Sequence, residues 1–156
     1  HMTSYAPLLA KEKHTQWSPD LIYFNNTEVK PTVGYYTQLM YGQNSGNEYL
    51  ASDVKLNNGW DAVKKRVGVS VVKDANTGDY IVKLVNMLPV EVSAQVKLDG
   101  VALVNPSATK TVLAGDPKDK SAKPVSSDFK VEGNDFPYAM PAYSFTVIRI
   151  HEGVGK

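Results

Sequence analysis

Apolar residues beyond about position 66 recur at every second position within short segments. Residues 67–71 and 92–98 show this alternation most clearly, and a period of two is typical of a β-strand with one buried face. Further strands are predicted from apolar content at residues 80–87, 109–113, 128–132 and 143–150. Turn-forming residues, as in the runs 74–79 and 99–100, lie between the strands. This part of the chain therefore predicts a β-sandwich or jelly roll.

The first 48 residues follow a different pattern. A helical end is predicted at residues 3–10 and a short apolar strand at 21–24. A second helix is predicted from about 32 to 42, with Pro31 near its first turn, where a missing N–H breaks no helical hydrogen bond. Apolar residues at helical spacing predict one buried face, made of Tyr35, Tyr36, Leu39 and Met40. The run 42–47, polar and containing glycine, ends this helix.

A strand and a helix followed by an all-β run predict a mainly β chain, in which a jelly-roll-like β-sandwich follows a short α/β remnant of another domain. The predicted boundaries are residues 3–48 for the remnant and 49–156 for the sandwich. His1-Met2 is typical of a cleaved affinity tag, so residues 1–2 are set apart and the chain is expected to be a piece of a longer protein. The run 115–127, rich in Lys, Asp, Pro and Ser, predicts a mobile surface loop.

Charge and composition argue against several classes of partner. The 156 residues carry 17 basic and 16 acidic side chains, for a net charge of +1, whereas a nucleic-acid-binding domain usually shows a clustered basic excess. No apolar run approaches the roughly 18 residues of a membrane-spanning helix. The absence of cysteine excludes disulfides and thiolate metal sites. We therefore predict no nucleic-acid partner and no membrane span.

Carboxyl groups are the first candidates for catalysis, because hydrolysis of a glycosidic bond requires two of them facing one bond. None of the six glutamates follows an apolar strand in a position that would aim it into a cleft: Glu12, Glu28, Glu48, Glu91, Glu132 and Glu152. Their neighbours are Lys, Asn or Gly, which is typical of solvated surface, whereas a general acid needs a desolvated setting. We predict that the chain has no catalytic residue and is not an enzyme by itself.

Metal and cofactor sites are not predicted either. Asp74, Asn76 and Asp79 resemble part of a calcium loop, but Gly78 stands at a ligand position and no closing glutamate follows. A hairpin turn is the preferred interpretation of this run. The remaining histidines, His14 and His151, lie at opposite ends of the chain without a spaced partner of ligand type.

Large aromatic side chains allow two interpretations. Trp17, Tyr23, Trp60 and Tyr138 have the chemistry to stack on sugar rings, but large aromatics more often pack in cores or between domains. Trp60 follows the turn-forming run Asn57-Asn58-Gly59, which favours exposure at that position. The core or interdomain interpretation is preferred for the group as a whole.

Three segments carry a resemblance to a known family. The runs Met2–Leu9 (MTSYAPLL), His14–Asn26 (HTQWSPDLIYFNN) and Pro31–Asn44 (PTVGYYTQLMYGQN) resemble the end of the catalytic barrel of family 51 α-L-arabinofuranosidases. The closing run Tyr138–Ile150 (YAMPAYSFTVIRI) is similar to the final strand of the same family, whereas 90–130 is generic β sequence. The resemblance thus extends over nearly the whole chain.

This resemblance implies a (β/α)8 barrel joined to a C-terminal jelly-roll-like sandwich, with residues 3–48 as the last β/α unit of the barrel. It also implies a retaining mechanism whose acid/base and nucleophile glutamates lie upstream of Met2. Barrel sites lie at the C-terminal ends of the strands and in the loops that follow. Gln16 is the expected counterpart of a glutamine that contacts arabinose in the family, with Trp17 and His14 as its neighbours in the same loop.

The function implied is that of a non-catalytic accessory domain of an enzyme that releases terminal α-L-arabinofuranosyl residues from plant arabinan or arabinoxylan. The alternative is a carbohydrate-binding module for plant cell-wall polysaccharide. The partners expected are the catalytic barrel of the same polypeptide and, through it, the arabinose-containing polysaccharide. The resemblance also suggests a secreted or periplasmic bacterial protein. Because a cut barrel exposes apolar surface, self-association of the chain is expected as well.

Overall fold

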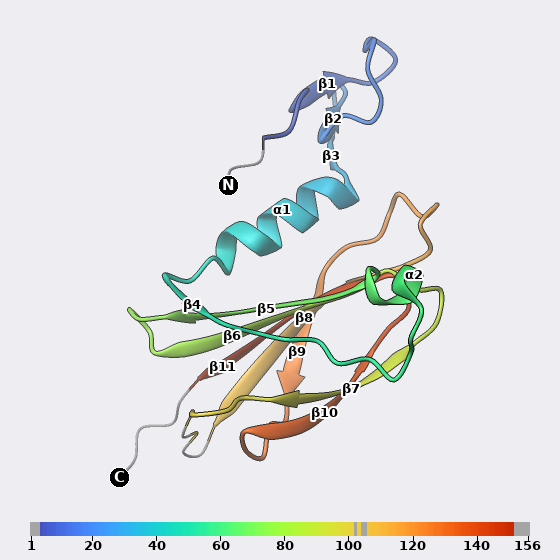
Figure 1. Cartoon of the computed structure of the whole chain (residues 1–156). Coiled ribbons are helices and arrows are strands. Elements are labelled where there is room, and N and C mark those ends of the chain that lie inside the picture. The colour runs from blue at the N-terminus through green and yellow to red at the C-terminus, as the bar shows by residue number, and fades with distance from the viewer. Residues whose placement is uncertain (1–3, 102, 104–105, 152–156) are drawn as a thin grey trace.

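The computed structural model describes residues 4–101, 103 and 106–151, and the fold is mainly β, as predicted (Figure 1). Its strands are β1 (Leu9–Lys11), β2 (Ile22–Phe24), β3 (Val29–Pro31), β4 (Glu48–Leu50), β5 (Val67–Asp74), β6 (Asp79–Asn86), β7 (Val92–Lys97), β8 (Ser107–Ala114), β9 (Val125–Phe129), β10 (Asp135–Met140) and β11 (Ser144–His151). Its helices are α1 (Val33–Gln43) and α2 (Asp61–Lys64). No described helix is long and apolar enough to cross a bilayer.

A six-stranded sheet in the order β4-β5-β6-β11-β8-β9 forms the main layer of the sandwich, and each neighbouring pair is antiparallel. Strands β5 and β6 form a hairpin in which Asp74 pairs with Asp79. Gly78 takes a positive φ of 79° in the turn, which glycine adopts without the steric conflict that a Cβ creates. The interpretation of 74–79 as a hairpin turn is therefore confirmed.

The second layer is the two-stranded sheet of β7 and β10. It covers one face of the six-stranded sheet, and the main core lies between the two layers. The fully buried side chains of this core are Val82, Met140, Ile148 and Ile150. Burial of this kind contributes about 1.5–3 kcal/mol for each large aliphatic side chain.

Helix α1 covers part of the opposite face of the six-stranded sheet (Figure 1). Met40 is buried there in a second apolar cluster, with partly buried Val33 and Tyr36 packed against it. Thr32 caps the helix, because its hydroxyl accepts a hydrogen bond from the backbone N–H of Tyr35 at 3.4 Å. The predicted stripe was only partly right, since Tyr35 and Leu39 are partly buried but do not belong to that cluster.

A small three-stranded sheet precedes α1. Strand β1 runs parallel to β2, and β3 pairs antiparallel to β2. The prediction of a helical end at 3–10 was wrong, because Leu9 and Ala10 pair with β2 instead. Pro31 was placed near the first turn of the helix, but it closes β3, and α1 begins at Val33.

Gly46 allows the chain to pass from α1 into the sandwich. Its φ is 62°, and a Cβ at this position would lie 2.7 Å from Val72 Cγ2 and 2.8 Å from the carbonyl oxygen of Lys73. Only glycine fits this close approach without displacing β5.

Several elements lie outside the predictions or differ in extent. The short strands β3 and β4, strand β10 and helix α2 were missed. Strand β9 spans Val125–Phe129 rather than 128–132, so the last residues of the predicted loop 115–127 are in a strand. The remaining strands agree with the predictions to within two residues at each end, apart from the three-residue extension of β5.

Candidate functional site

The three predicted site residues lie in the loop that joins β1 to β2. His14, Gln16 and Trp17 are all exposed, with Trp17 at 68% of its full accessible surface. Because β1 and β2 are parallel, the loop starts at the C-terminal end of one strand and returns to the N-terminal end of the next. No hydrogen bond between these three side chains is found in the described part of the chain, so they share a loop without forming a bonded cluster.

Thr15 and Asp20 hold this loop in shape. The Thr15 hydroxyl lies 3.1 Å from Asp20 Oδ2, and it accepts a hydrogen bond from the backbone N–H of Trp17 at 3.1 Å. The backbone N–H of Asp20 in turn donates to the Tyr23 hydroxyl at 2.9 Å. These bonds tie the exposed tip of the loop to the start of β2.

Asp20 is the one residue of the loop from 12 to 20 that is buried, with 0% exposure. Its Oδ1 is the only buried side-chain nitrogen or oxygen among the described residues that lacks a hydrogen-bond partner. A buried unpaired acceptor costs about 1–3 kcal/mol. Neither Thr15 nor Asp20 was predicted from the sequence as a site residue. An available signal was the position of Asp20 directly before an apolar strand, where a carboxylate is rarely tolerated without partners.

A charged cluster lies where β1 and β2 end. Lys30 Nζ contacts Glu12 Oε1 at 2.8 Å and Glu28 Oε1 at 2.9 Å, and Asn25 Nδ2 donates to Glu12 Oε2 at 2.9 Å and Glu28 Oε1 at 3.2 Å. The hydrogen bond from Lys30, followed by that from Asn25, lowers the pKa of both glutamates. Both carboxyl groups are therefore ionised near neutral pH, whereas a glycosidase acid must remain protonated.

The other described glutamates, Glu48, Glu91 and Glu132, are exposed. A hydrogen bond from Lys130 lowers the pKa of the Glu132 carboxyl. Glu152 lies outside the described residues. The prediction that the glutamates are surface residues thus holds for those that are described, with Glu12 half-buried.

The aromatic candidates divide into exposed and buried residues. Trp60 is 76% exposed, as its turn predicted. Tyr138 is 6% exposed, lies in the main core and shares a hydrogen bond with the Thr146 hydroxyl at 2.9 Å. Tyr23 is half-buried and accepts the N–H of Asp20. Packing in the core is confirmed for Tyr138 and does not hold for Trp17 and Trp60, for which packing between domains stays a prediction.

The acidic hairpin turn is held by protein groups. Arg149 donates to Asp79 Oδ2 at 2.6 Å and to Asp74 Oδ2 at 3.0 Å, and His151 Nδ1 lies 2.6 Å from Asp79 Oδ1. Burial raises the pKa of Asp79, but the hydrogen bonds from Arg149, Thr77 and His151 outweigh it and hold that pKa below its ordinary value. No group of three potential metal ligands occurs among the described residues.

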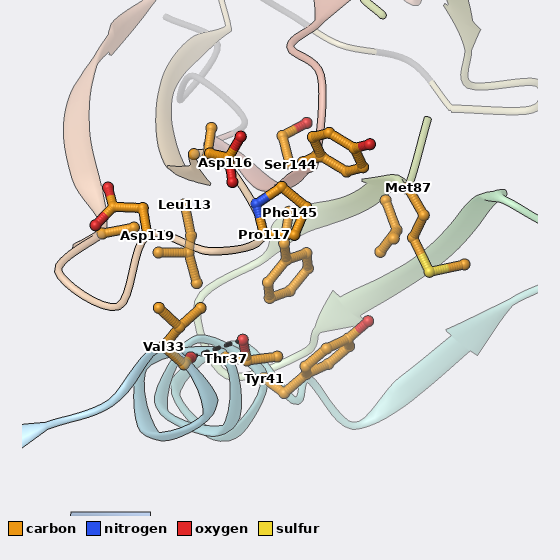
Figure 2. A pocket seen from close by; sticks show the side chains of 15 residues that line it. Val33, Thr37, Tyr41, Met87, Leu113, Asp116, Pro117, Asp119, Ser144 and Phe145 are labelled. Carbon is orange, nitrogen blue, oxygen red and sulfur yellow. Dashed lines mark hydrogen bonds between the residues drawn. The ribbon is translucent and has the colours of Figure 1, made fainter. Parts of the chain in front are cut away.

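A cavity of about 440 Å³ lies between α1, the six-stranded sheet and the loop after β8 (Figure 2). Val33, Thr37 and Tyr41 enter it from the helix, Phe145 from β11 and Met87 from the position directly after β6. The Tyr41 and Phe145 rings stack with their centroids 4.5 Å apart. The carboxylates at its edge already bind the loop itself, since Asp116 accepts the N–H of Lys118 and Asp119 that of Ser121. The cavity therefore resembles a packing gap at the junction of helix and sandwich.

Comparison with known proteins places the chain next to one group of enzymes. A family model described as "Alpha-L-arabinofuranosidase C-terminal domain" matches residues 1–144. The chain is 31% identical over 161 residues to the probable α-L-arabinofuranosidase A of Aspergillus oryzae, which covers 96% of this chain and 23% of that protein. It is 27% identical over 158 residues to α-L-arabinofuranosidase 1 of Arabidopsis thaliana, with 93% and 22% covered.

A shorter match of 41% identity over 51 residues links it to an extracellular exo-α-L-arabinofuranosidase of Streptomyces chartreusis, covering 33% of this chain and 6% of that protein. The chain spans 23% of the length of the Aspergillus oryzae relative, less than a quarter.

Solved structures show the same architecture. A family 51 α-L-arabinofuranosidase with bound arabinose aligns with a TM-score of 0.77 at 26% identity, covering 96% of this chain and 24% of that one. The catalytic domain of a family 30 xylanase C from Talaromyces cellulolyticus aligns with a TM-score of 0.61 at 16% identity, over 91% of this chain and 29% of that one. The second likeness shows the fold alone.

Proposed function

Because the chain belongs to the family of α-L-arabinofuranosidase C-terminal domains, we propose that it is the non-catalytic accessory part of an enzyme that hydrolyses terminal α-L-arabinofuranosyl residues of plant arabinan or arabinoxylan. In this proposal the sandwich supports a catalytic barrel of the same polypeptide. Residues 3–48 are the last β/α unit of that barrel, and the retaining glutamate pair lies in the part of the enzyme that precedes this chain.

The observation that supports the non-catalytic role is the environment of Glu12 and Glu28, two glutamates whose carboxylates contact the same lysine. Glu12 and Glu28 both bind Lys30, and the pKa of each is lowered. A retaining glycosidase needs one carboxyl with a raised pKa as its acid and one ionised carboxylate as its nucleophile. The pair supplies two ionised carboxylates that share one ammonium group, and neither is kept protonated to act as the acid.

An activity assay tests this proposal. The purified chain is incubated with an aryl α-L-arabinofuranoside, with the full-length enzyme as a positive control. We expect the chain to release no more chromophore than buffer. Turnover that copurifies with the chain and disappears in the Glu12→Gln or Glu28→Gln variant would contradict the non-catalytic role.

The exposed loop with His14, Gln16 and Trp17 is proposed to contact the sugar only when the barrel is whole. One side-chain amide orients a ligand but contributes only about 1 kcal/mol as a buried hydrogen bond, so the isolated chain should not bind arabinose measurably. In the full-length enzyme, Gln16→Ala should lower kcat/KM at least about tenfold, which corresponds to 1.4 kcal/mol. The matched control is Gln38→Ala, since Gln38 is exposed on α1 away from this loop. If both variants have the same kcat/KM, the loop does not contact the substrate.

A carbohydrate-binding module is the second candidate function, and the exposure of Trp60 favours it, because 76% of its surface is free and an exposed indole can stack on a sugar ring. Titration of arabinan and arabinoxylan into the chain, monitored by tryptophan fluorescence, separates the two functions. A supporting domain gives no saturable change. A saturable change that Trp60→Ala abolishes would favour the binding module.

Export from the cell is proposed on the basis of the Streptomyces chartreusis relative, which is described as extracellular. Self-association of the isolated chain is proposed because the three-stranded sheet exposes Leu9 and Val29 at 62% and 67%. In the complete enzyme the same surface would face the rest of the barrel.

A further inference from the structure

We propose that Asp20 is the positioning residue of the loop that carries Gln16 and Trp17, an inference that rests on the proposed function. Asp20 Oδ2 acts through the Thr15 hydroxyl on the backbone of Trp17.

This inference follows from the contacts of the Thr15 hydroxyl. A carboxylate only accepts hydrogen bonds, so Thr15 is the donor in its 3.1 Å contact with Asp20 Oδ2. The carbonyl oxygen of Trp17 is a second acceptor for the same proton, also at 3.1 Å. The lone pairs of that hydroxyl then remain free to accept the Trp17 N–H at 3.1 Å. Residue 16 lies between these two anchored positions, so its backbone is fixed from both sides although its side chain is exposed.

Asp20 has 0% exposure and its Oδ1 has no partner. Because this oxygen is covered by the chain's own atoms, neither a sugar hydroxyl nor a group from the rest of the enzyme has access to it. Asp20 therefore acts on the loop through Oδ2.

Three substitutions test this role of Asp20. Thr15→Val removes the link to Trp17 and leaves the carboxylate. Asp20→Ala removes the acceptor. Asp20→Asn retains an oxygen for the Thr15 hydroxyl and is the conservative variant that should preserve the loop.

Loop anchoring is measured on the chain itself. Trp17 and Trp60 are the only tryptophans, so a Trp60→Phe background reports Trp17 alone. We expect Thr15→Val and Asp20→Ala to lower the fluorescence anisotropy of Trp17 and to raise its quenching by acrylamide, whereas Asp20→Asn leaves both close to the parent values. The controls are Thr27→Val and Asp53→Ala, whose hydrogen bonds are local and exposed. Unchanged Trp17 signals in Thr15→Val and Asp20→Ala overturn the inference, and the folding of each variant is checked by circular dichroism.

Positioning is measured by steady-state kinetics on the full-length enzyme. Thr15→Val should lower kcat/KM about tenfold or more, because misplacement of a contact group by a fraction of an ångström is costly in rate. In the Thr15→Val background, Gln16→Ala should add less than a twofold further loss, since both changes remove the same contact. Asp20→Ala should give a similar loss, whereas Asp20→Asn, which keeps the acceptor for Thr15, should stay within about twofold of the parent.

The outcomes distinguish failure of this inference from failure of the proposed function. If Gln16→Ala lowers kcat/KM but Thr15→Val does not, Asp20 is not a positioning residue, while the proposed loop contact stands. If Gln16→Ala itself has no effect, the loop is outside the substrate site and both ideas fail. If Asp20→Asn loses as much kcat/KM as Asp20→Ala, Asp20 does not act through an acceptor oxygen and the positioning role is overturned.

Discussion

The three-stranded sheet and the sandwich differ in how much of their own apolar surface they bury. In the sandwich, Ile81, Val82 and Ile148 reach 0% exposure. In the small sheet, Ala10 is the only buried residue of the three strands, and Leu9 and Val29 are 62% and 67% exposed. The sandwich therefore has a core that can stabilise it alone, whereas the small sheet depends on neighbours for most of its stability.

Helix α1 connects the two regions physically. At its start, the Thr32 hydroxyl donates to the carbonyl oxygen of Leu21 at 2.7 Å, which ties the helix to the small sheet. Toward its end, Met40 is buried against the six-stranded sheet. Helix α1 is therefore the element through which the sandwich supports the small sheet. Because the two regions differ in the apolar surface that they bury, mutations in them should change the free energy of unfolding by different amounts.

Removal of a core side chain from the sandwich should have the largest effect. Ile148→Ala creates a cavity next to fully buried neighbours and should reduce the free energy of unfolding by about 2–5 kcal/mol. Leu9→Ala in β1 should cost less than about 0.5 kcal/mol because its side chain is exposed. Urea titration followed by circular dichroism measures both. Similar losses for the two variants would contradict the contrast drawn between the regions.

The acidic hairpin should give an intermediate effect that depends on pH. Because the folded-state pKa of Asp79 is lowered, its contribution is complete above its unfolded pKa of about 4 and is lost as the pH falls through the lower folded value. Asp79→Asn should therefore reduce stability by about 1.5–3 kcal/mol at pH 6. Between pH 6 and pH 3 the variant should lose less stability than the parent chain.

Urea unfolding at the two pH values tests this, with Asp53→Asn as the control, since Asp53 is exposed and accepts a bond only from its neighbour Val54. If the free energy of unfolding of the Asp79→Asn variant falls with pH as steeply as that of the parent, the Asp79 carboxylate is not the source of the pH-dependent stability.

Charging the exposed edge of the small sheet should have the smallest effect on stability. Val29→Lys in β3 should change the free energy of unfolding by less than about 0.5 kcal/mol, yet shift self-association toward the monomer, because lysine on an edge strand opposes pairing between chains. Val125→Lys is a matched control, since Val125 is also 67% exposed and lies on β9, an edge strand of the large sheet.

Light scattering at several concentrations reports the change in self-association. If Val125→Lys weakens self-association and Val29→Lys does not, the contact between chains lies on the sandwich and not on the small sheet.

Sequence patterns predicted the long elements well and the short ones poorly. Residues 67–71 and 80–87 were recognised as strands because their apolar content and turn residues are local properties of the chain. Strand β10 was missed, because Pro137 stands inside the alternation of Phe136, Tyr138 and Met140, and proline argues against a central strand. It is tolerated here because β10 pairs with β7 alone.

The candidate site was predicted in its exposed part only. His14, Gln16 and Trp17 came from a resemblance between sequences, and all three are exposed in one loop. Thr15 and Asp20 were not recognised, because their importance depends on a 3.1 Å contact and on complete burial. Neither property is visible in the order of the residues.

By itself, the sequence determined the mainly β fold, the hairpin at 74–79 and the helix before the sandwich, since each follows from periodicity and turn chemistry within a few residues. Only the tertiary structure decided which faces are covered. Leu9–Lys11 became a strand because β2 offered a parallel partner. Lys83 is 5% exposed because β6 alternates between a core on one side and the face that α1 covers on the other, and that burial lowers its pKa. Such outcomes depend on contacts between residues distant in the chain, which local propensity does not encode.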